Sequence, residues 1–114
     1  MSMNKEFHEC ATACLDAHKA ALLTLKAGLR RGSRLAEPAL LPRLIECSRI
    51  CHTCAEFCLD ESEQAPPVAE ACAKVCERCA LDCERYDDLP LRQCAEVLRY
   101  CARSCYRVVH AVPA

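Results

Sequence analysis

Aromatic residues are scarce in this chain of 114 residues, which has no tryptophan, two phenylalanines and three tyrosines. β-Branched residues are also few, whereas alanine, leucine, glutamate, arginine and cysteine dominate. This composition favours helices over strands. The formal net charge is -1, so there is no electrostatic case for a nucleic acid or an anionic membrane as partner. The length suits one domain, residues 1–114, with a single core.

Long apolar runs are also lacking. Nothing approaches the ~18 consecutive apolar residues of a membrane span, and the segment from Met1 to Phe7 has no apolar stretch behind a basic one, as a secretion signal would have. The sequence shows no acid–base pair, phosphate-binding loop or activated nucleophile. We therefore expect a cytoplasmic protein that is not an enzyme.

Cysteine is unusually abundant, with 13 residues. Cys47-x3-Cys51-x2-Cys54-x3-Cys58 recurs after a short break as Cys72-x3-Cys76-x2-Cys79-x3-Cys83. At about 100° per residue, offsets of 0, 4, 7 and 11 fall within roughly 60° of one helix face. Each quartet therefore predicts a stripe of thiols about 16 Å long on one helix.

Four helices are predicted, over residues 4–28, 42–62, 66–87 and 89–111. Asn4 and Asp88 are candidate N-caps, Gly28 is a candidate stop, and prolines 42, 66, 67 and 90 suit first turns. Residues 28–41 are expected to form a loop. Because the second and third connections are short, we predict an all-α, up-down-up-down four-helix bundle with a cysteine-lined core.

The same spacing extends to the first and last helices, so that one helical template accounts for every cysteine. It matches Cys10 and Cys14 followed by Ala17 and Ala21, and it matches Cys94, Leu98, Cys101 and Cys105. The bundle topology brings a polar group to one end and a leucine plug to the other. The polar group is His8, Cys10, Cys58, Asp60, Cys72, Cys105 and His110. The expected plug is Leu22, Leu25, Leu29, Leu41, Leu44 and Leu89.

A thiol-lined core indicates a soft monovalent metal. A buried free cysteine packs as a small apolar residue, whereas a buried thiolate without a counter-charge is costly. Because Cu(I) with one thiolate is formally neutral, many such pairs can fill a dry core, and thiolates select Cu(I). A zinc site with four cysteines carries a charge of about -2 and usually sits on loops with C-x2-C spacing.

The two full quartets, with the partial ones in the first and last helices, resemble the bacterial four-helix-bundle copper storage proteins over about residues 4–111. The resemblance implies a cytosolic protein that stores multiple Cu(I) ions on Cys within the bundle and assembles as a homotetramer. It also implies metal entry at one end through His, Asp or Met. His8, His110 and Asp60 match those types by location. A copper chaperone or a small thiol would deliver the metal. Cytosolic members generally hold more cysteines, so 13 here implies a lower capacity. Ala17, Ala21 and Leu98 depart from the pattern, which bears on whether the leucine-rich end holds metal continuously.

The predicted metal ligands are thus thirteen thiols and three residues at the entry end: Cys10, Cys14, Cys47, Cys51, Cys54, Cys58, Cys72, Cys76, Cys79, Cys83, Cys94, Cys101, Cys105, His8, Asp60 and His110.

Other interpretations of the cysteines stay open at this point. Cys54-x3-Cys58 and Cys72-x3-Cys76 also resemble a disulfide-stapled helical hairpin, although the odd number of cysteines opposes it. Cys47-x3-Cys51-x2-Cys54 has the spacing of an iron–sulfur site, and cysteine in place of alanine in an ordinary core is a third alternative. His18 falls on the inner stripe of the first helix and is interpreted as a packed core residue, with metal contact as the alternative. His52 is expected to be exposed.

Overall fold

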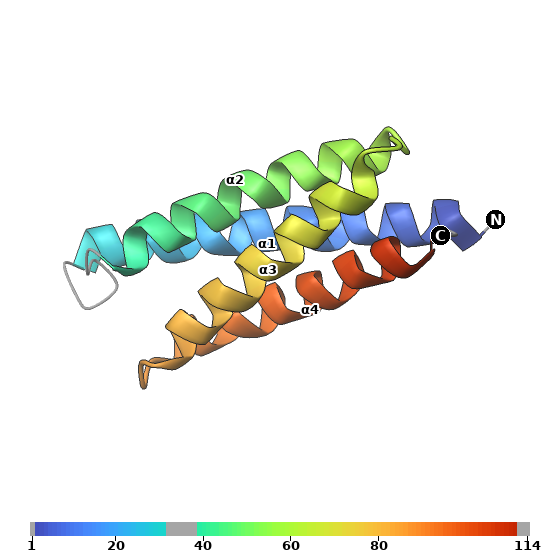
Figure 1. The fold of residues 1–114 in the computed structure, drawn as a ribbon. Coiled ribbons are helices and arrows are strands. Elements are labelled where there is room, and N and C mark those ends of the chain that lie inside the picture. Colours follow the sequence, from blue (N-terminus) through green and yellow to red (C-terminus); the bar gives the residue numbers. More distant parts are fainter. Residues whose placement is uncertain (1, 32–38, 112–114) are drawn as a thin grey trace.

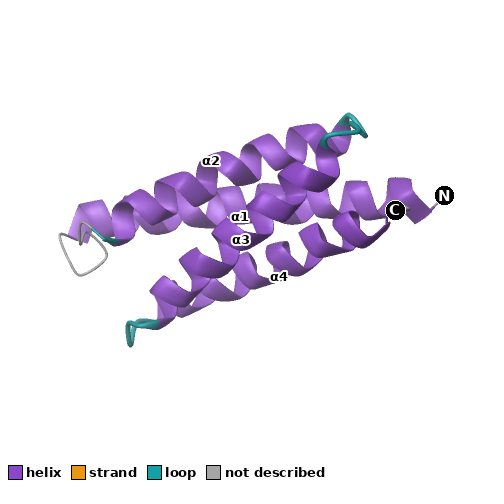
Figure 2. Ribbon diagram, viewed as in Figure 1, coloured by secondary structure: helices purple, strands orange, loops and turns teal. Residues whose placement is uncertain are grey.

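The computed structural model describes residues 2–31 and 39–111 and contains four helices. They are α1 (Ser2–Arg31), α2 (Leu40–Leu59), α3 (Ala65–Glu84) and α4 (Leu89–Ala111). Neighbouring helices in the sequence run in opposite directions, as Figure 1 shows. Within the described ranges the structure holds helices, short connections and no strand (Figure 2). The predicted all-α, up-down-up-down bundle is confirmed.

Each helix contacts two others, so that the four surround a common interior. α1 contacts α2 and α4, and α3 contacts the same two helices from the opposite corner. The start of α1, the end of α2, the start of α3 and the end of α4 meet at one end of the bundle (Figure 1). This is the end at which the sequence predicted His8 and His110 to lie, and it is called the histidine end below.

The helix bounds differ from the predicted ones by a few residues. α1 continues past Gly28, which is buried and stays within the helix, because packing overrides the weak helix propensity of glycine. Asn4 also lies inside α1 and is not its N-cap. The predicted loop at 28–41 falls partly on residues 32–38, outside the described ranges. Asp88 does cap α4, because its Oδ1 accepts a hydrogen bond from the Leu91 N–H at 3.0 Å.

α2 ends at Leu59 instead of residue 62 because Glu61 takes a left-handed conformation, with φ 53°. The Ser62 N–H donates to the Phe57 carbonyl at 3.2 Å, and the Glu61 N–H donates to the Cys58 carbonyl at 3.1 Å. These two bonds form a Schellman motif. Its left-handed position usually holds glycine, since another residue there costs about 1 kcal/mol. The sequence pattern therefore did not reveal this end.

The predicted leucine plug is largely wrong. Leu22, Leu29 and Leu89 are exposed at 42%, 60% and 61%, and Leu25 and Leu41 are only partly buried. The inner stripe of α1 continues with small residues, namely Ala21, Thr24 and Gly28. Leu22, Leu25 and Leu29 each follow one of these by one residue, about 100° around the helix, and so turn away from the interior. Of the predicted plug only Leu44 is fully buried, and Leu40 and Leu91 join it in filling this end of the core.

Candidate metal centre

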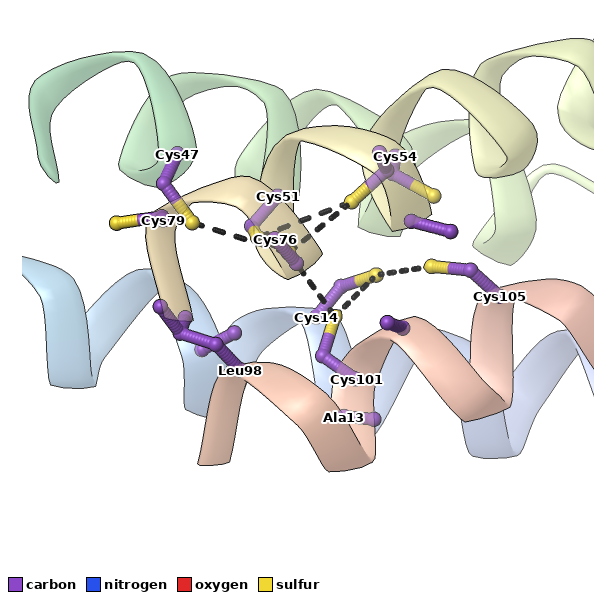
Figure 3. Close-up of a cluster of buried hydrophobic side chains, with 14 of the residues drawn as sticks. Ala13, Cys14, Cys47, Cys51, Cys54, Cys76, Cys79, Leu98, Cys101 and Cys105 are labelled. Carbon is purple, nitrogen blue, oxygen red and sulfur yellow. Dashed lines mark hydrogen bonds between the residues drawn. The ribbon is translucent and has the colours of Figure 1, made fainter. Parts of the chain in front are cut away.

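All thirteen cysteines face the interior of the bundle. Each has at most 3% of its surface exposed, and all thirteen are free thiols. The predicted spacing explains this, since offsets of 0, 4, 7 and 11 keep each stripe on the inner face of its helix. Figure 3 shows sulfur atoms from all four helices pointing toward one another in the middle of the bundle.

The thiols near the histidine end form the densest part of the cluster. Cys10 Sγ lies 3.8 Å from Cys14 Sγ and 3.6 Å from Cys105 Sγ. The distance between the Cys14 and Cys105 sulfur atoms is 3.8 Å. Cys54 joins these three, and the four sulfur atoms lie within 4.8 Å of one another. Helices α1, α2 and α4 therefore contribute to one four-thiol group.

Two further groups continue the cluster toward the centre. Cys14, Cys72, Cys101 and Cys105 form one, and Cys51, Cys72, Cys76 and Cys101 form the other, each with its sulfur atoms within 4.8 Å of one another. Cys101 belongs to both and lies 3.6 Å from Cys14 Sγ and 3.9 Å from Cys76 Sγ (Figure 3). The middle group shares two thiols with each of the other two groups, so ions bound in neighbouring groups would lie next to each other.

In the half of the core farther from His8 and His110, fewer helices contribute cysteines. Here the thiols come mainly from α2 and α3, with Cys47 Sγ 3.7 Å from Cys76 Sγ. Cys79 lies beside Cys47 and Cys83, and Cys83 lies beside Cys94. Ala17, Ala21 and Leu98 occupy the template positions of α1 and α4 in this region and are fully buried. The thiols thus form one continuous column, wide at the histidine end and narrow at the other.

The thiols titrate as a coupled set. Contacts with Cys101 and other thiols, followed by burial, raise the pKa of Cys72 and Cys76 above the ordinary 9.0. Although a contact with Cys10 lowers it, Cys54 and burial raise the pKa of Cys58 to about 12.

A few thiols shift the other way. Contacts with Cys105 and then Cys14 lower the pKa of Cys101, and contacts with Cys79 and Cys94 lower that of Cys83 to about 4. A few thiolates are therefore stabilised by neighbouring S–H groups, while loss of further protons is opposed unless a cation enters.

The disulfide-stapled hairpin does not fit this arrangement. Cys76 Sγ is nearest to Cys51 Sγ, at 3.4 Å, and Cys72 Sγ lies 3.8 Å from the same atom. One α2 thiol thus faces two α3 thiols, as expected for a shared set of ligands and not for separate pairs. An iron–sulfur site on a loop is not formed either, because all the cysteines lie within described helices.

The three predicted entry residues lie on the surface at the histidine end. His8 Nε2 is 3.3 Å from Glu61 Oε2, and both side chains are exposed. The His110 ring stacks on the Tyr106 ring, with centroids 6.4 Å apart. Asp60 is exposed at the C-terminus of α2. In the described part of the chain, none of the three lies close enough to other histidine, cysteine or carboxylate side chains to belong to one of the candidate metal-binding groups.

Two contacts near the column were not anticipated. A contact with Cys83 and then burial raise the pKa of Cys94, and Thr24, which lies beside that thiol, opposes the rise. Asp82, almost buried, accepts from Arg43 Nε at 2.7 Å and so ties the end of α3 to the start of α2. The sequence shows a carboxylate one residue before Cys83, with Arg78 and Arg85 one turn away, but it does not show the burial or the contact with Arg43, which lies 39 positions away.

A four-helix bundle around a column of free thiols defines a protein class built to hold soft metal ions. The family model of the copper storage protein matches residues 2–110, so the chain belongs to the copper storage protein family. The resemblance noted from the cysteine pattern is confirmed. Among proteins with curated descriptions, none matches the chain. No described helix is both long enough and apolar enough to cross a membrane.

Solved structures show the same fold. The chain resembles the Nmul_A1745 protein from Nitrosospira multiformis at 28% identity and a TM-score of 0.86, over 95% of this chain and 98% of that one. It also resembles the Cu(I)-bound copper storage protein BsCsp3 at 24% identity and a TM-score of 0.84. The second match covers 90% of this chain and 98% of that one.

Proposed function

We propose that this protein takes up and stores multiple Cu(I) ions on the thiolates of its core, as a non-catalytic store. The observation that carries the proposal is the column of thirteen free, buried thiols with its three overlapping four-thiol groups. Membership of the copper storage protein family and the likeness in fold to a Cu(I)-bound copper storage protein support it.

Charge explains why Cu(I) suits this interior. Each Cu(I) that binds replaces one thiol proton with one positive charge, so the core stays close to neutral as it fills. Divalent ions would add charge with every ion or require extra thiolates. Soft thiolate ligands favour Cu(I) in addition.

The spacing of the sulfur atoms suits ions shared between two thiolates. Two metal–sulfur bonds end to end span about 4.6 Å if each is near the ~2.3 Å of a zinc–thiolate bond. The sulfur atoms of each group lie within 4.8 Å of one another, so small side-chain movements would fit an ion between neighbours. We expect dense packing of ions in the wide half of the column and fewer in the narrow half.

Metal entry at the His8 and His110 end is part of the proposal. These side chains and Asp60 are exposed beside the end of the column where four helices contribute thiols. Imidazole and carboxylate groups can hold an arriving ion before the thiols take it. Since every thiol is almost completely covered, entry requires movement of the side chains around Cys58 and Cys10. A copper chaperone or a small thiol would donate the ion.

We further propose that the protein is cytoplasmic and forms a homotetramer, as its resemblance to the cytosolic members of the family implies. Free thiols are the state that a reducing cytosol maintains. Leu15, Leu22 and Leu29 project from α1 at intervals of seven residues and are 42%, 42% and 60% exposed. Such a stripe is typical of a helix that packs against a partner. Sedimentation velocity measures the number of chains directly.

Replacement of Cys51, Cys54, Cys76 and Cys79 together by alanine tests the core as the store. We expect the number of bound Cu(I) ions to fall while circular dichroism shows unchanged helicity. The matched control replaces four exposed residues of the same helices by alanine, namely Arg49, Thr53, Lys74 and Arg78. Equal Cu(I) capacity in the cysteine variant and the control would rule out the core as the store.

A further inference from the structure

Two histidines meet on the seam between α1 and α2, outside the thiol column. His18 of α1 is partly buried, and the His52 side chain of α2 is 51% exposed. Their ring centroids are 5.0 Å apart, with the planes tilted by 52°. Figure 1 shows α1 and α2 running side by side along this seam. Neither histidine has a role in the storage function proposed above.

The hydrogen bonds of His18 determine which ring nitrogen is free. His18 Nδ1 lies 2.8 Å from the backbone carbonyl oxygen of Ser48 and 3.1 Å from Ser48 Oγ. Because a carbonyl oxygen only accepts, the proton of this bond sits on Nδ1. The neutral ring therefore has its lone pair on Nε2. A ring N–H donated to a backbone carbonyl is also the usual support of a metal-binding histidine.

His52 is oriented in a similar way. Its Nδ1 lies 3.6 Å from Glu56 Oε1, one helical turn farther along α2. The carboxylate attracts the proton to Nδ1 and leaves Nε2 on the other side of the ring as the lone-pair nitrogen. Two imidazoles thus share the same tautomer preference, and the group that sets it differs between them.

The spacing of the two rings suits one shared ion. A metal–imidazole bond is ~2.0–2.1 Å long, so two rings on a tetrahedral ion have centroids about 5 Å apart when the distance from nitrogen to ring centre is added. The observed 5.0 Å agrees with this spacing. Because His52 is half exposed, water can complete the coordination.

The geometry points to a second metal site, in which His18 Nε2 and His52 Nε2 bind one divalent ion of the Zn²⁺ class. Neutral imidazole is a good ligand for such borderline ions, whereas the soft thiolates of the core prefer Cu(I). The site would therefore hold a different ion from the core. The inference stands independently of copper storage, since it rests on the two rings, the hydrogen bonds of His18 and the Glu56 carboxylate beside His52.

The test is a Zn²⁺ titration of the Cu(I)-loaded protein, followed by proton–nitrogen NMR of the imidazole rings. We expect the Nε2 signals of His18 and His52 to shift together and to saturate at one Zn²⁺ per chain. The exposed position of His52 makes His52→Gln a safe variant for folding, and it should abolish the response of His18. Removal of the supporting carboxylate in Glu56→Gln should weaken Zn²⁺ binding about tenfold.

The matched control is the double variant His8→Gln/His110→Gln, which removes two other surface histidines and should leave the response unchanged. A titration that shifts only His8 and His110 would overturn the inference and leave His18 and His52 as an aromatic pair. So would a His52→Gln variant in which His18 still responds. Copper uptake is measured separately on the thiols, so a failure of copper storage would be seen apart from a failure of this site.

Discussion

Cys101 and Cys94 offer a sharp comparison, because they lie on the same helix and differ in how many thiols surround them. Cys101 belongs to two of the three four-thiol groups, whereas Cys94 belongs to none. Both are buried, at 0% and 3% exposure. Replacement of either by alanine removes one buried sulfur atom, and we expect each to lower the stability of the metal-free protein by a similar amount, about 1 kcal/mol.

Their effects on copper should differ. Cys94→Ala removes one ligand at the narrow end and should lower capacity by about one Cu(I), with one ion per thiolate. Cys101→Ala removes a ligand from two groups at once. Because one thiolate there would help to hold two ions, we expect capacity to fall by about two ions. The remaining ions near Cys14 and Cys76 should bind about tenfold more weakly, equivalent to about 1.4 kcal/mol.

The assay is a titration of each reduced variant with Cu(I) under anaerobic conditions, in competition with a chromophoric chelator. Thermal unfolding of the metal-free variants shows whether their stabilities are comparable. Equal losses of capacity and affinity in the two variants would contradict this prediction, since they would show that the thiols bind copper independently of their grouping.

Three further predictions follow from the same geometry. The double variant His8→Ala/His110→Ala should load Cu(I) more slowly and keep nearly full capacity, as stopped-flow transfer from a chelator would show, and an unchanged rate would remove both residues from the entry mechanism. Leu98→Cys completes the template of α4 and should raise capacity by about one ion, whereas unchanged capacity would mean that the narrow half does not hold copper. Because the raised pKa values of Cys72 and Cys76 favour the protonated thiol in the folded state, their contribution to the stability of the metal-free protein is complete below the unfolded pKa of about 9 and is lost at higher pH. The melting temperature of the metal-free protein should therefore fall above that pH while that of the Cu(I)-loaded protein stays steady, and parallel curves for the two forms would contradict this.

Local patterns in the sequence predicted the fold and the inward face of every thiol. Helical spacing determines which side of a helix a cysteine occupies, and Asp88 and the prolines marked helix starts. The membership of the four-thiol groups was not predictable in the same way. It depends on the axial register between helices, which places Cys76 beside Cys51 and Cys101 next to Cys14, and no local pattern encodes that register.

The predictions that proved wrong also concern features that no local sequence pattern encodes. Leu22, Leu25 and Leu29 lie one residue beyond a stripe of small residues, so most of the expected plug is not buried. The end of α2 depends on a left-handed Glu61 where glycine would be the usual signal. His18 and His52 are 34 positions apart, and only the packing of α1 on α2 brings their rings together.

The most direct test of copper storage in the bundle core is an anaerobic Cu(I) titration of the fully reduced protein against a chromophoric chelator, with free thiols counted in parallel. We predict tight binding of about a dozen ions per chain, roughly one per thiolate, with the thiols consumed as copper enters. Binding of only one or two ions, or thiols that resist full reduction, would contradict a copper store in the bundle core.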